Sequence, residues 1–543
     1  MTRPPAAAVS DNQPPPFAPR DLWQDDLALR EAVAREGAAG FTDRVAAYGA
    51  LAGETVLALS HDAHRDRPRL RTLDVAGNRI DRVEFHPAYH AVMAAAIENG
   101  VAGLSWSEPV PGAHVARAAL SYLHYQAEPG SSCPLTMTHA AVPVLRREPG
   151  LREWADKAAA LYYDAREVPV VDKPGITLGM GMTEKQGGSD VRANTTAATP
   201  VALESDDPAA PYALTGHKWF FSAPMSDGFL VLAQAPGGLT CFLMPRRLHD
   251  GSKNAFALQR LKDKLGDWSN ASSEVEFHGA RAWRVGEEGR GIATILEMVM
   301  LTRLDCMLGS SGLMRMAAAQ AIHHCRHRVA FGRPLADQPL MRNVLADLVL
   351  EAEAALTLSM RVARAVDAAP RDPSEAAFAR VATAVGKYWI CKRAPLVAAE
   401  ALECIGGNGY VEESLLPRLY RQAPLNSIWE GSGNIQCLDV LRALAKEPAT
   451  GAALWRELQD APLDAALLDR LRAPLHGEAV VPEATARSFV EALALALQAS
   501  VLHRSGSPLA MVFQRTRLQA PHAMALGTLP ADIAFGDVLA RAL

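Results

Sequence analysis

The segment GMTEKQGGSDVRA, residues 181–193, combines two adjacent glycines with small hydroxyl side chains. Gly187 and Gly188 carry no Cβ, so a backbone built from them can approach a flat ligand closely. Thr183 and Ser189 supply hydroxyl groups, and the exposed amides of such a loop can bind carbonyl or phosphate oxygens. Taken alone, the same pattern is also typical of a polar turn between a helix and a strand. The residue types therefore indicate either a cofactor-binding loop or a plain connection.

Short apolar runs around this motif predict a small β domain. FLVLAQA, residues 229–235, and TCFLMP, residues 240–245, are joined by a Pro-Gly-Gly turn, which is typical of a hairpin. Further along, Val275 and Phe277 alternate with polar residues, as they do in a half-buried strand. We expect residues 177–289 to form this domain.

Helical patterns dominate on both sides of the β domain. Residues 25–176 form a predicted N-terminal helical domain, in which HAVMAAAIENG ends at Gly100, a candidate C-cap. The Pro-rich residues 1–24 carry no apolar core of a secretion signal and predict an extended tail, either disordered or lying along a neighbouring surface.

Residues 290–445 predict a helical bundle. Apolar side chains at i, i+3, i+4 and i+7 mark a long helix that reaches about Ala369: Met341, Val344, Leu345 and Leu348. Pro370 and Pro373 then break the helix, and another helix covers Glu375–Ile405. After these, residues 446–543 predict an appended helical domain rich in Ala and Leu. The fold class is α+β and mainly α, with four parts that follow the tail.

The composition excludes several classes of protein. With 543 residues, 49% of them hydrophobic, the chain is long enough for three to five domains and is not intrinsically disordered. A net charge of −5 gives no overall basic excess for nucleic acid. The seven scattered cysteines form no CxxC pair, which favours a reducing cytoplasm and argues against disulfides or a metal site. The sequence contains no run of about 18 apolar residues, the length that predicts a membrane span.

Four segments, in this order along the chain, resemble the signatures of the acyl-CoA dehydrogenase family: the Gly-rich motif above, RVAFGRPLADQPLMRN (328–343), ECIGGNGYVEESLLPRLYR (403–421) and SIWEGSGNIQ (427–436). Within that family, MTEKQGGSDV, GHKWFFSAPMSDGFLVLAQ and the stretch 416–444 resemble the AidB branch, the alkylation-response flavoproteins. That branch also carries an extra C-terminal helical region. The resemblance implies FAD as cofactor and a homotetramer, with FAD at a contact between subunits.

The resemblance places Glu430 where many family members keep the catalytic base. In the family reaction a carboxylate removes the α-proton of an acyl thioester while hydride leaves the β-carbon for flavin N5. Burial in an apolar pocket raises a carboxyl pKa toward the value that such a base needs. The alternative is that Glu430 braces the helix that begins near Gly431, since acidic side chains favour helix N-termini.

The resemblance also assigns residues to FAD. Those expected along the isoalloxazine edge and its other face are Met182, Thr183, Gly188, Ser189, Phe220, Phe221, Ser222 and Ile428. Ser432 and Asn434 are expected to reach the ribityl or pyrophosphate portion. The adenosine diphosphate part, across a subunit contact, is expected to meet Arg328, Phe331, Gln338, Gly406 and Gly407. Glu184 and Asp190 are expected to bond loop amides, a structural role.

Several residues depart from an ordinary acyl-CoA dehydrogenase. Trp429 stands where a tyrosine commonly precedes the base, and an indole there would narrow the substrate cavity. Some family members take the base from an earlier helix, but the matching position here is Thr302, which cannot serve. Gln422 and Pro424 change the approach to the base motif.

The AidB resemblance further implies binding of double-stranded DNA through the C-terminal region. From Lys446 to the end there are nine basic and ten acidic residues, so the region is about neutral. The candidate DNA contacts are Arg442, Arg504, Arg515 and Arg517. Arginines on phosphates give salt-sensitive binding without sequence preference. A solvated helix face or a tetramer contact is an equally good interpretation of the charge alone.

Three hypotheses follow. The first is an AidB-like FAD protein that binds duplex DNA and acts in the response to DNA alkylation, with weak or no acyl-CoA dehydrogenase activity. The second is an FAD-dependent oxidoreductase acting on CH–CH groups of an acyl-CoA or another small substrate. The third is a scaffold in which FAD is structural.

Overall fold

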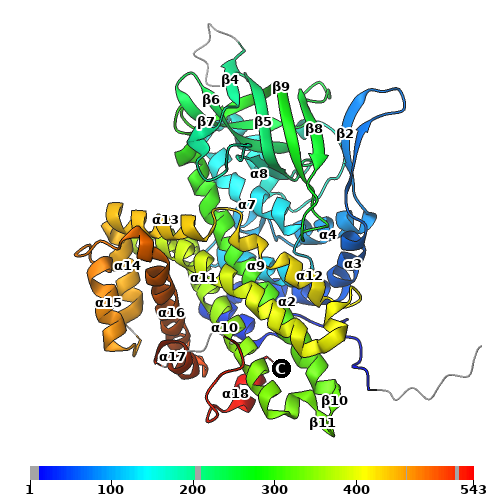
Figure 1. Ribbon diagram of the computed structural model, residues 1–543. Coiled ribbons are helices and arrows are strands. Elements are labelled where there is room, and N and C mark those ends of the chain that lie inside the picture. The colour runs from blue at the N-terminus through cyan, green and yellow to red at the C-terminus, as the bar shows by residue number, and fades with distance from the viewer. Residues whose placement is uncertain (1–11, 202–209, 460, 520–524, 543) are drawn as a thin grey trace, which may run out of the picture.

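The computed structural model describes residues 12–201, 210–459, 461–519 and 525–542 (Figure 1). Helices come first in the chain, as predicted: α1 (Leu27–Arg35), α2 (Thr42–Leu51), α3 (Leu57–Arg65), α4 (Pro87–Glu98), α5 (Leu104–Ser107), α6 (Ala113–Ala127), α7 (Ser132–Arg146) and α8 (Arg152–Ala159). Gly100 follows α4 with a φ of +94°, the left-handed conformation expected of a residue that ends a helix.

An antiparallel hairpin interrupts these helices, which the sequence analysis did not expect. Its strands are β1 (Arg69–Leu73) and β2 (Arg79–Glu84), and Figure 1 shows it standing beside the β domain. The strands read RLRTL and RIDRVE, so charged residues occupy most positions and no apolar run marks them. β1 is largely exposed, and β2 buries Val83 together with the charged Asp81. The hairpin was missed because neither strand has the alternation of apolar and polar residues that marks a half-buried strand.

The β domain is a closed barrel with one added strand at each side. Its strands are β3 (Leu178–Gly181), β4 (Ala197–Pro200), β5 (Tyr212–Ser222), β6 (Gly228–Ala235), β7 (Gly238–Pro245), β8 (Phe256–Leu261) and β9 (Ser272–Val285). Pairings run β6–β4–β5–β9–β7 and return to β6, while β3 pairs with β6 and β8 pairs with β9. Closure leaves few free edges. The predicted hairpin is β6–β7, and the predicted alternating strand lies within β9.

Three long helices lie below the barrel: α9 (Gly291–His327), α10 (Pro339–Ala368) and α11 (Pro373–Ile405). They pack on one another and on α6 and α7. A short β10–β11 turn (Val329–Ala330, Arg333–Pro334) joins α9 to α10, and α12 (Leu416–Gln422) and α13 (Gly433–Lys446) follow α11. Pro373 begins α11 at its first turn, capped by Asp372, so it starts a helix where we expected it to break one.

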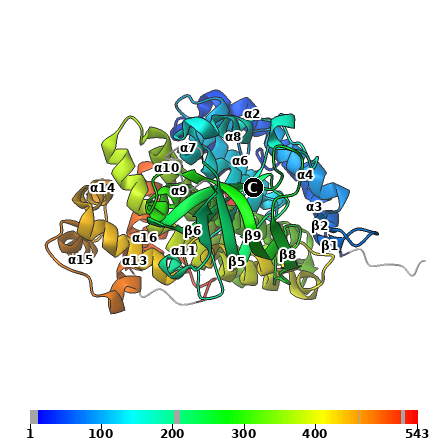
Figure 2. The same cartoon turned by 90° about the horizontal axis from the view of Figure 1, so that it is seen from above.

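The appended helices pack beside α10, α11 and α13, as the view from above also shows (Figure 2). They are α14 (Pro448–Gln459), α15 (Ala465–Leu475), α16 (Ala486–Arg504), α17 (Ala510–Gln514) and α18 (Phe535–Ala540). Residues Glu483–Arg504 are long and apolar enough by composition to span a membrane, yet 78% of the apolar 18-residue window within them is buried inside the protein. Packing in the core therefore accounts for the apolar character of α16.

Buried ion pairs hold the appended helices to α10. Arg517 donates to Asp347 and, at 3.0 Å, to Glu351. Arg541 bonds Glu353 at 3.0 Å in the same way. The three acids lie on α10, and each is buried in the fold.

Candidate active site

Glu184 braces the Gly-rich loop from inside. Its carboxylate accepts hydrogen bonds from the amides of Thr195 and Thr196, at 2.7 and 3.2 Å, and from Lys218 Nζ at 2.6 Å. Burial by itself raises the pKa of Glu184, but the Lys218 ammonium and the amide donors outweigh it and lower the pKa to about 2. The carboxylate is therefore ionised and structural, which confirms the prediction that Glu184 bonds loop amides.

The loop presents its predicted flavin residues at the junction of barrel and helices. Met182 and Thr183 are half-buried, whereas Gly188 and Ser189 are exposed. A Cβ on Gly188 would lie 2.5 Å from Thr183 Oγ1, so only glycine fits. The Trp219 amide donates to the Thr183 carbonyl at 2.8 Å and ties the loop to β5.

Strand alternation separates the predicted pair Phe220 and Phe221. Phe220 is 48% exposed, while Phe221 is fully buried in the barrel core, with its ring 4.3 Å from that of Phe229. Successive side chains of a strand point to opposite faces, so the two phenylalanines cannot both cover one ligand. The Phe221 side chain therefore cannot cover FAD beside Phe220, which leaves only its backbone for such a contact. The half-buried Ser222 that follows it points to the same face as Phe220.

Glu430 lies between α9 and α13, and its carboxylate is bound from α9. Thr302 Oγ1 is 2.6 Å from Glu430 Oε2. The backbone of Glu430 has a φ of +58°, a left-handed conformation that is rare for a residue with a side chain and is found where surrounding structure enforces it. Helix α13 begins only at Gly433, with Ser432 as N-cap. The partner of the carboxylate is thus a side chain of α9, which favours the base position over a helix brace.

Three side chains fix the backbone of the Glu430 loop. Lys387 Nζ, buried in α11, donates to the carbonyls of Asn426, Trp429 and Gly431 at 2.8–3.0 Å. Arg303 Nε and Gln436 Nε2 both donate to the Glu430 carbonyl at 3.1 Å. These donors satisfy main-chain oxygens and leave the carboxylate to Thr302. Burial raises the pKa of Glu430 and outweighs Thr302, Lys387 and Arg303, which lower it.

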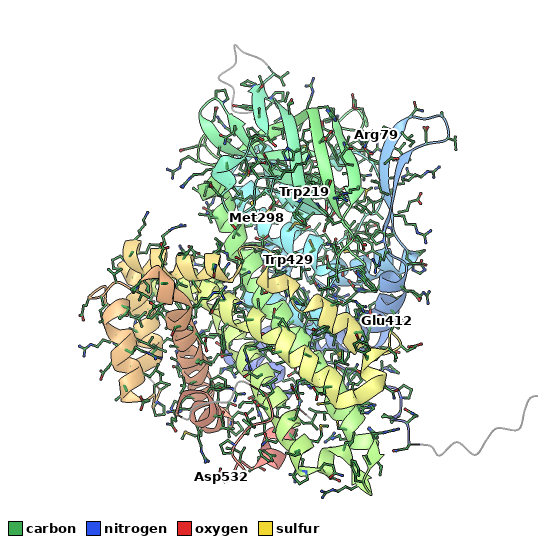
Figure 3. The ribbon with its side chains drawn as sticks, in the orientation of Figure 1. Arg79, Trp219, Met298, Glu412, Trp429 and Asp532 are labelled. Atoms are coloured by element: carbon green, nitrogen blue, oxygen red, sulfur yellow. The ribbon has the colours of Figure 1, made fainter. Side chains whose placement is uncertain are left out.

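Two of the departures from the family pattern have structural roles. The indole N–H of Trp429 donates to Asn426 Oδ1 at 2.9 Å, which holds the ring in place beside Glu430. Gln422 is buried, and its Oε1 accepts from the Asp267 amide at 2.8 Å, so it links α12 to the barrel. Figure 3 shows Trp429 at the level where the helices meet the barrel, with Trp219 above it.

The residues expected near the adenosine part lie at the far end of α9. Arg328 follows the last turn of α9, and Cys325 Sγ donates to the Cys404 carbonyl at 3.7 Å, which brings the end of α11, with Gly406 and Gly407, to the same place. The 26 positions from Thr302 to Arg328 cover about 39 Å of helix at 1.5 Å per residue. That distance exceeds the reach of a dinucleotide. One chain therefore does not bring both halves of the predicted FAD site together.

The far cluster is open and apolar at its tip. Phe331 is 96% exposed and has a φ of +53°. Gln338 closes the β10–β11 turn by donating to the Ala330 carbonyl at 3.0 Å. Arg328 donates to the carbonyl of Asn12 at 2.7 Å, so the N-terminal tail lies along this segment of its own chain.

The chain's surfaces fit a bound flavin nucleotide. Phe220 and Ile428, which is 63% exposed, present apolar area on the segments assigned to the isoalloxazine. Ser432 makes no side-chain capping bond to α13, so the helix keeps first-turn amides for a phosphate. Asn434, exposed on that first turn, accepts from Arg487 of α16 at 2.8 Å.

Sequence reasoning missed the residues that shape the loop. Lys387 sits on a helix face that is otherwise buried and apolar, and a lone lysine in that pattern was the available signal. The sequence indicated only that Thr302, at the alternative base position, cannot act as a base. Its hydrogen bond to Glu430 joins segments 128 positions apart, which no local pattern shows.

Comparison with known proteins shows the family of the chain. The model of the acyl-CoA dehydrogenase middle domain matches residues 179–280, that of its C-terminal domain matches residues 289–445, and that of the adaptive response protein AidB N-terminal domain matches residues 12–165. The class of protein is thus a flavoprotein of the acyl-CoA dehydrogenase fold. FAD is the cofactor of this class, and the loop, the exposed aromatic edge and the helix terminus described above fit it.

The chain belongs to the acyl-CoA dehydrogenase family and, within it, to the AidB branch. It is 51% identical over 440 residues to the putative acyl-CoA dehydrogenase AidB of Escherichia coli, covering 80% of each chain. It is 32% identical over 402 residues to acyl-CoA dehydrogenase family member 11 of Caenorhabditis elegans, covering 71% of this chain and 64% of that protein. The crystal structure of C. elegans ACDH-11 in complex with C11-CoA is 27% identical, with a TM-score of 0.83 and coverage of 95% and 94%.

Proposed function

We propose that this chain oxidises a short acyl thioester, with Glu430 as the base that removes the α-proton. The observation that carries the proposal is the Glu430 carboxyl itself, whose pKa is raised by burial and which has Thr302 as its hydrogen-bond partner. A base of raised pKa suits abstraction of a weakly acidic C–H proton. The C11-CoA complex of the similar C. elegans protein supports a CoA thioester as the ligand, and the short chain length is inferred separately from Trp429.

Each residue of the site has a separate role in the proposed reaction. Glu430 takes the proton, and the donors Lys387 and Arg303 keep the loop carbonyls from turning toward the carboxylate. When bound, FAD supplies the acceptor for the hydride that leaves the β-carbon. Asn426 fixes the ring of Trp429 beside the base. We expect this indole to restrict the space for the acyl group, and therefore short acyl groups and slow turnover.

A panel of acyl-CoAs with an artificial electron acceptor tests the proposal. We expect measurable oxidation of four- and five-carbon thioesters and none of sixteen-carbon thioesters, because Trp429 limits the cavity. A flavin that no thioester reduces under anaerobic conditions would contradict the proposed reaction.

We also propose that two copies of the chain build each FAD site. The two predicted halves lie about 39 Å apart along α9 in one chain, so a second copy must bring its far cluster to the first copy's Glu430 end. Phe331, Leu340 and Tyr410 are each more than 80% exposed at that far end, and such an apolar patch favours contact with another protein surface. A homotetramer built from two such pairs fits the family resemblance.

Phe331→Ala is expected to lower the FAD content per chain at least several-fold, because the exposed ring then no longer covers the partner's cofactor. Val75→Ala is the matched control, since Val75 is 99% exposed on the β1–β2 turn and lies on no predicted FAD segment. Flavin absorbance and sedimentation velocity measure the two outcomes. Equal FAD content in both variants would exclude Phe331 from the site.

A second function, duplex DNA binding, is proposed for the exposed surface of α13 and the appended helices. Arg442 is exposed on α13, Arg515 pairs with Asp532 at the surface, and Arg504 pairs with Glu457 at 2.5 Å while remaining one-third exposed. Arg517, a predicted DNA contact, is not part of the proposed surface, because its guanidinium is buried in ion pairs with acids of α10. The AidB relationship supports a role in the response to DNA alkylation.

Arg442→Glu together with Arg515→Glu is expected to weaken binding to a random-sequence duplex and to reduce the salt slope by about two, one per lost phosphate contact. Fluorescence anisotropy between about 50 and 200 mM salt measures both. Arg69→Glu on β1 is the control, because Arg69 is exposed far from the proposed surface. Absence of salt-dependent binding by the native protein would refute the DNA proposal and leave the dehydrogenase proposal intact.

A further inference from the structure

The hydroxyl of Thr302 lies between two acceptors and can donate to only one. Its Oγ1 is 3.0 Å from the Val299 carbonyl, one turn earlier in α9, and 2.6 Å from Glu430 Oε2. A threonine hydroxyl has a single proton and two lone pairs. When the proton points at Val299, Thr302 offers a lone pair to Glu430; when it points at Glu430, Thr302 is a donor to the carboxylate.

We propose that Thr302 is a positioning residue that reverses its hydrogen bond to Glu430 as that carboxyl gains and loses its proton. With Glu430 ionised, Thr302 donates to Oε2. When Glu430 carries the proton from the substrate carbon on Oε2, that O–H donates to Thr302 Oγ1, and the threonine proton turns to the Val299 carbonyl. The step moves one proton from carbon to carboxylate and otherwise exchanges hydrogen bonds only. This inference rests on the proposed role of Glu430 as base.

None of the charged or titratable groups described around Glu430 competes with Thr302 for the hydrogen bond to the Glu430 carboxyl. Lys387 of α11 is occupied by three loop carbonyls, and Arg303 of α9 by the Glu430 carbonyl and by Asp439 of α13 at 2.6 Å. Cys133 of α7 is buried, and burial raises the pKa of its thiol to about 12, so it stays neutral. Among the residues that the structure describes, Thr302 is the side chain whose donor reaches the carboxylate.

The reversal has a consequence for the base. A carboxylate that loses its only donor on protonation would rotate in search of a new partner, whereas Glu430 keeps the same neighbour at the same atom in both states. On the protein side the movement is the turn of the Thr302 hydroxyl toward the Val299 carbonyl, and a partner already in place keeps the cost of reorganisation low. Thr302 thus holds the position at which some family members place their base, and it serves the base that comes from Glu430.

Thr302→Val and Thr302→Ser test the inference as a matched pair. Valine keeps the shape and removes the hydroxyl, while serine keeps the hydroxyl. The measurement is the pH titration of the protonated Glu430 carbonyl stretch by infrared difference spectroscopy of the FAD-loaded protein, assigned by its loss in Glu430→Gln. Charge-assisted hydrogen bonds are stronger than neutral ones, so valine should raise the pKa of Glu430 by about one unit. Serine should leave it near the native value.

Turnover provides the second readout. Valine should shift the acid limb of the kcat/KM profile upward with the pKa and lower kcat at least tenfold, and serine should restore most of both. A native-like titration in Thr302→Val, or a Thr302→Ser that behaves like valine, would overturn the proposal. The infrared titration needs no substrate, so failure of the proposed reaction and failure of the Thr302 proposal are separate results.

Discussion

Replacing Glu430 with glutamine is expected to lower kcat for thioester oxidation by about 10²–10⁴-fold, the range usual for loss of a general base. The amide keeps the size and the hydrogen bond to Thr302 but cannot accept the substrate proton. Stopped-flow reduction of the bound flavin measures the chemical step directly. Unchanged reduction in the variant would remove Glu430 from the mechanism.

The pH profile provides an independent check on the same residue. The base works as the carboxylate, so kcat/KM rises as pH passes upward through the pKa of Glu430. Burial raises that pKa above the ordinary value of 4.5, and the acid limb should therefore fall at a higher pH than for an exposed glutamate. Glu412→Gln is the matched control, because Glu412 is exposed and pairs with Arg421 away from the site, as Figure 3 shows.

Arg517→Met is expected to lower the free energy of unfolding by about 3–5 kcal/mol, the cost of breaking a buried ion pair from one side. The arginine joins α10 to the appended helices, and its loss leaves Asp347 and Glu351 buried without it. Burial already raises the pKa of Asp347, so protonation of that acid can relieve the cost. The loss of stability should therefore shrink as pH falls, which urea titrations at several pH values can measure.

Arg515→Met is the control for Arg517→Met. Arg515 lies two positions earlier and pairs with Asp532 at the exposed surface, where ion pairs contribute little. We expect no measurable change in the urea midpoint for this variant. Equal destabilisation by both substitutions would show that the buried pairs do not hold the appended helices in place.

Much of the fold could be predicted because apolar periodicity is a local property. The β6–β7 hairpin, the long helix α10 and the helical region after residue 446 all follow from spacing that a short window contains. The β1–β2 hairpin could not, because its strands lack a regular alternation of apolar and polar residues and one of the two residues that β2 buries is the charged Asp81. The closure of the barrel could not be predicted from local patterns either, because the pairing of β4 with β6 depends on tertiary packing.

Motifs in the sequence indicated which segments form the candidate site. They did not indicate which way each side chain points or which remote side chains it contacts. Motif position singled out Glu430 and the Gly-rich loop, but it grouped Phe220 with Phe221, which strand alternation separates. The same limit hid Lys387 and the bond from Thr302, because both act across helices that are remote in sequence. Arg517 was read as a surface charge because its acidic partners lie some 170 positions away.

The span of α9 has a genetic consequence. We take each FAD site to combine Glu430 of one copy with Arg328 and Phe331 of the other. A chain altered only at the far cluster then disables the site that contains its partner's Glu430. The site that contains its own Glu430 uses the partner's far cluster and stays intact. In a cell that makes both alleles, each mixed pair would keep one intact site of two, so such a variant would not act as a dominant negative. Two chains damaged at different halves of the site would restore one intact site in each mixed pair.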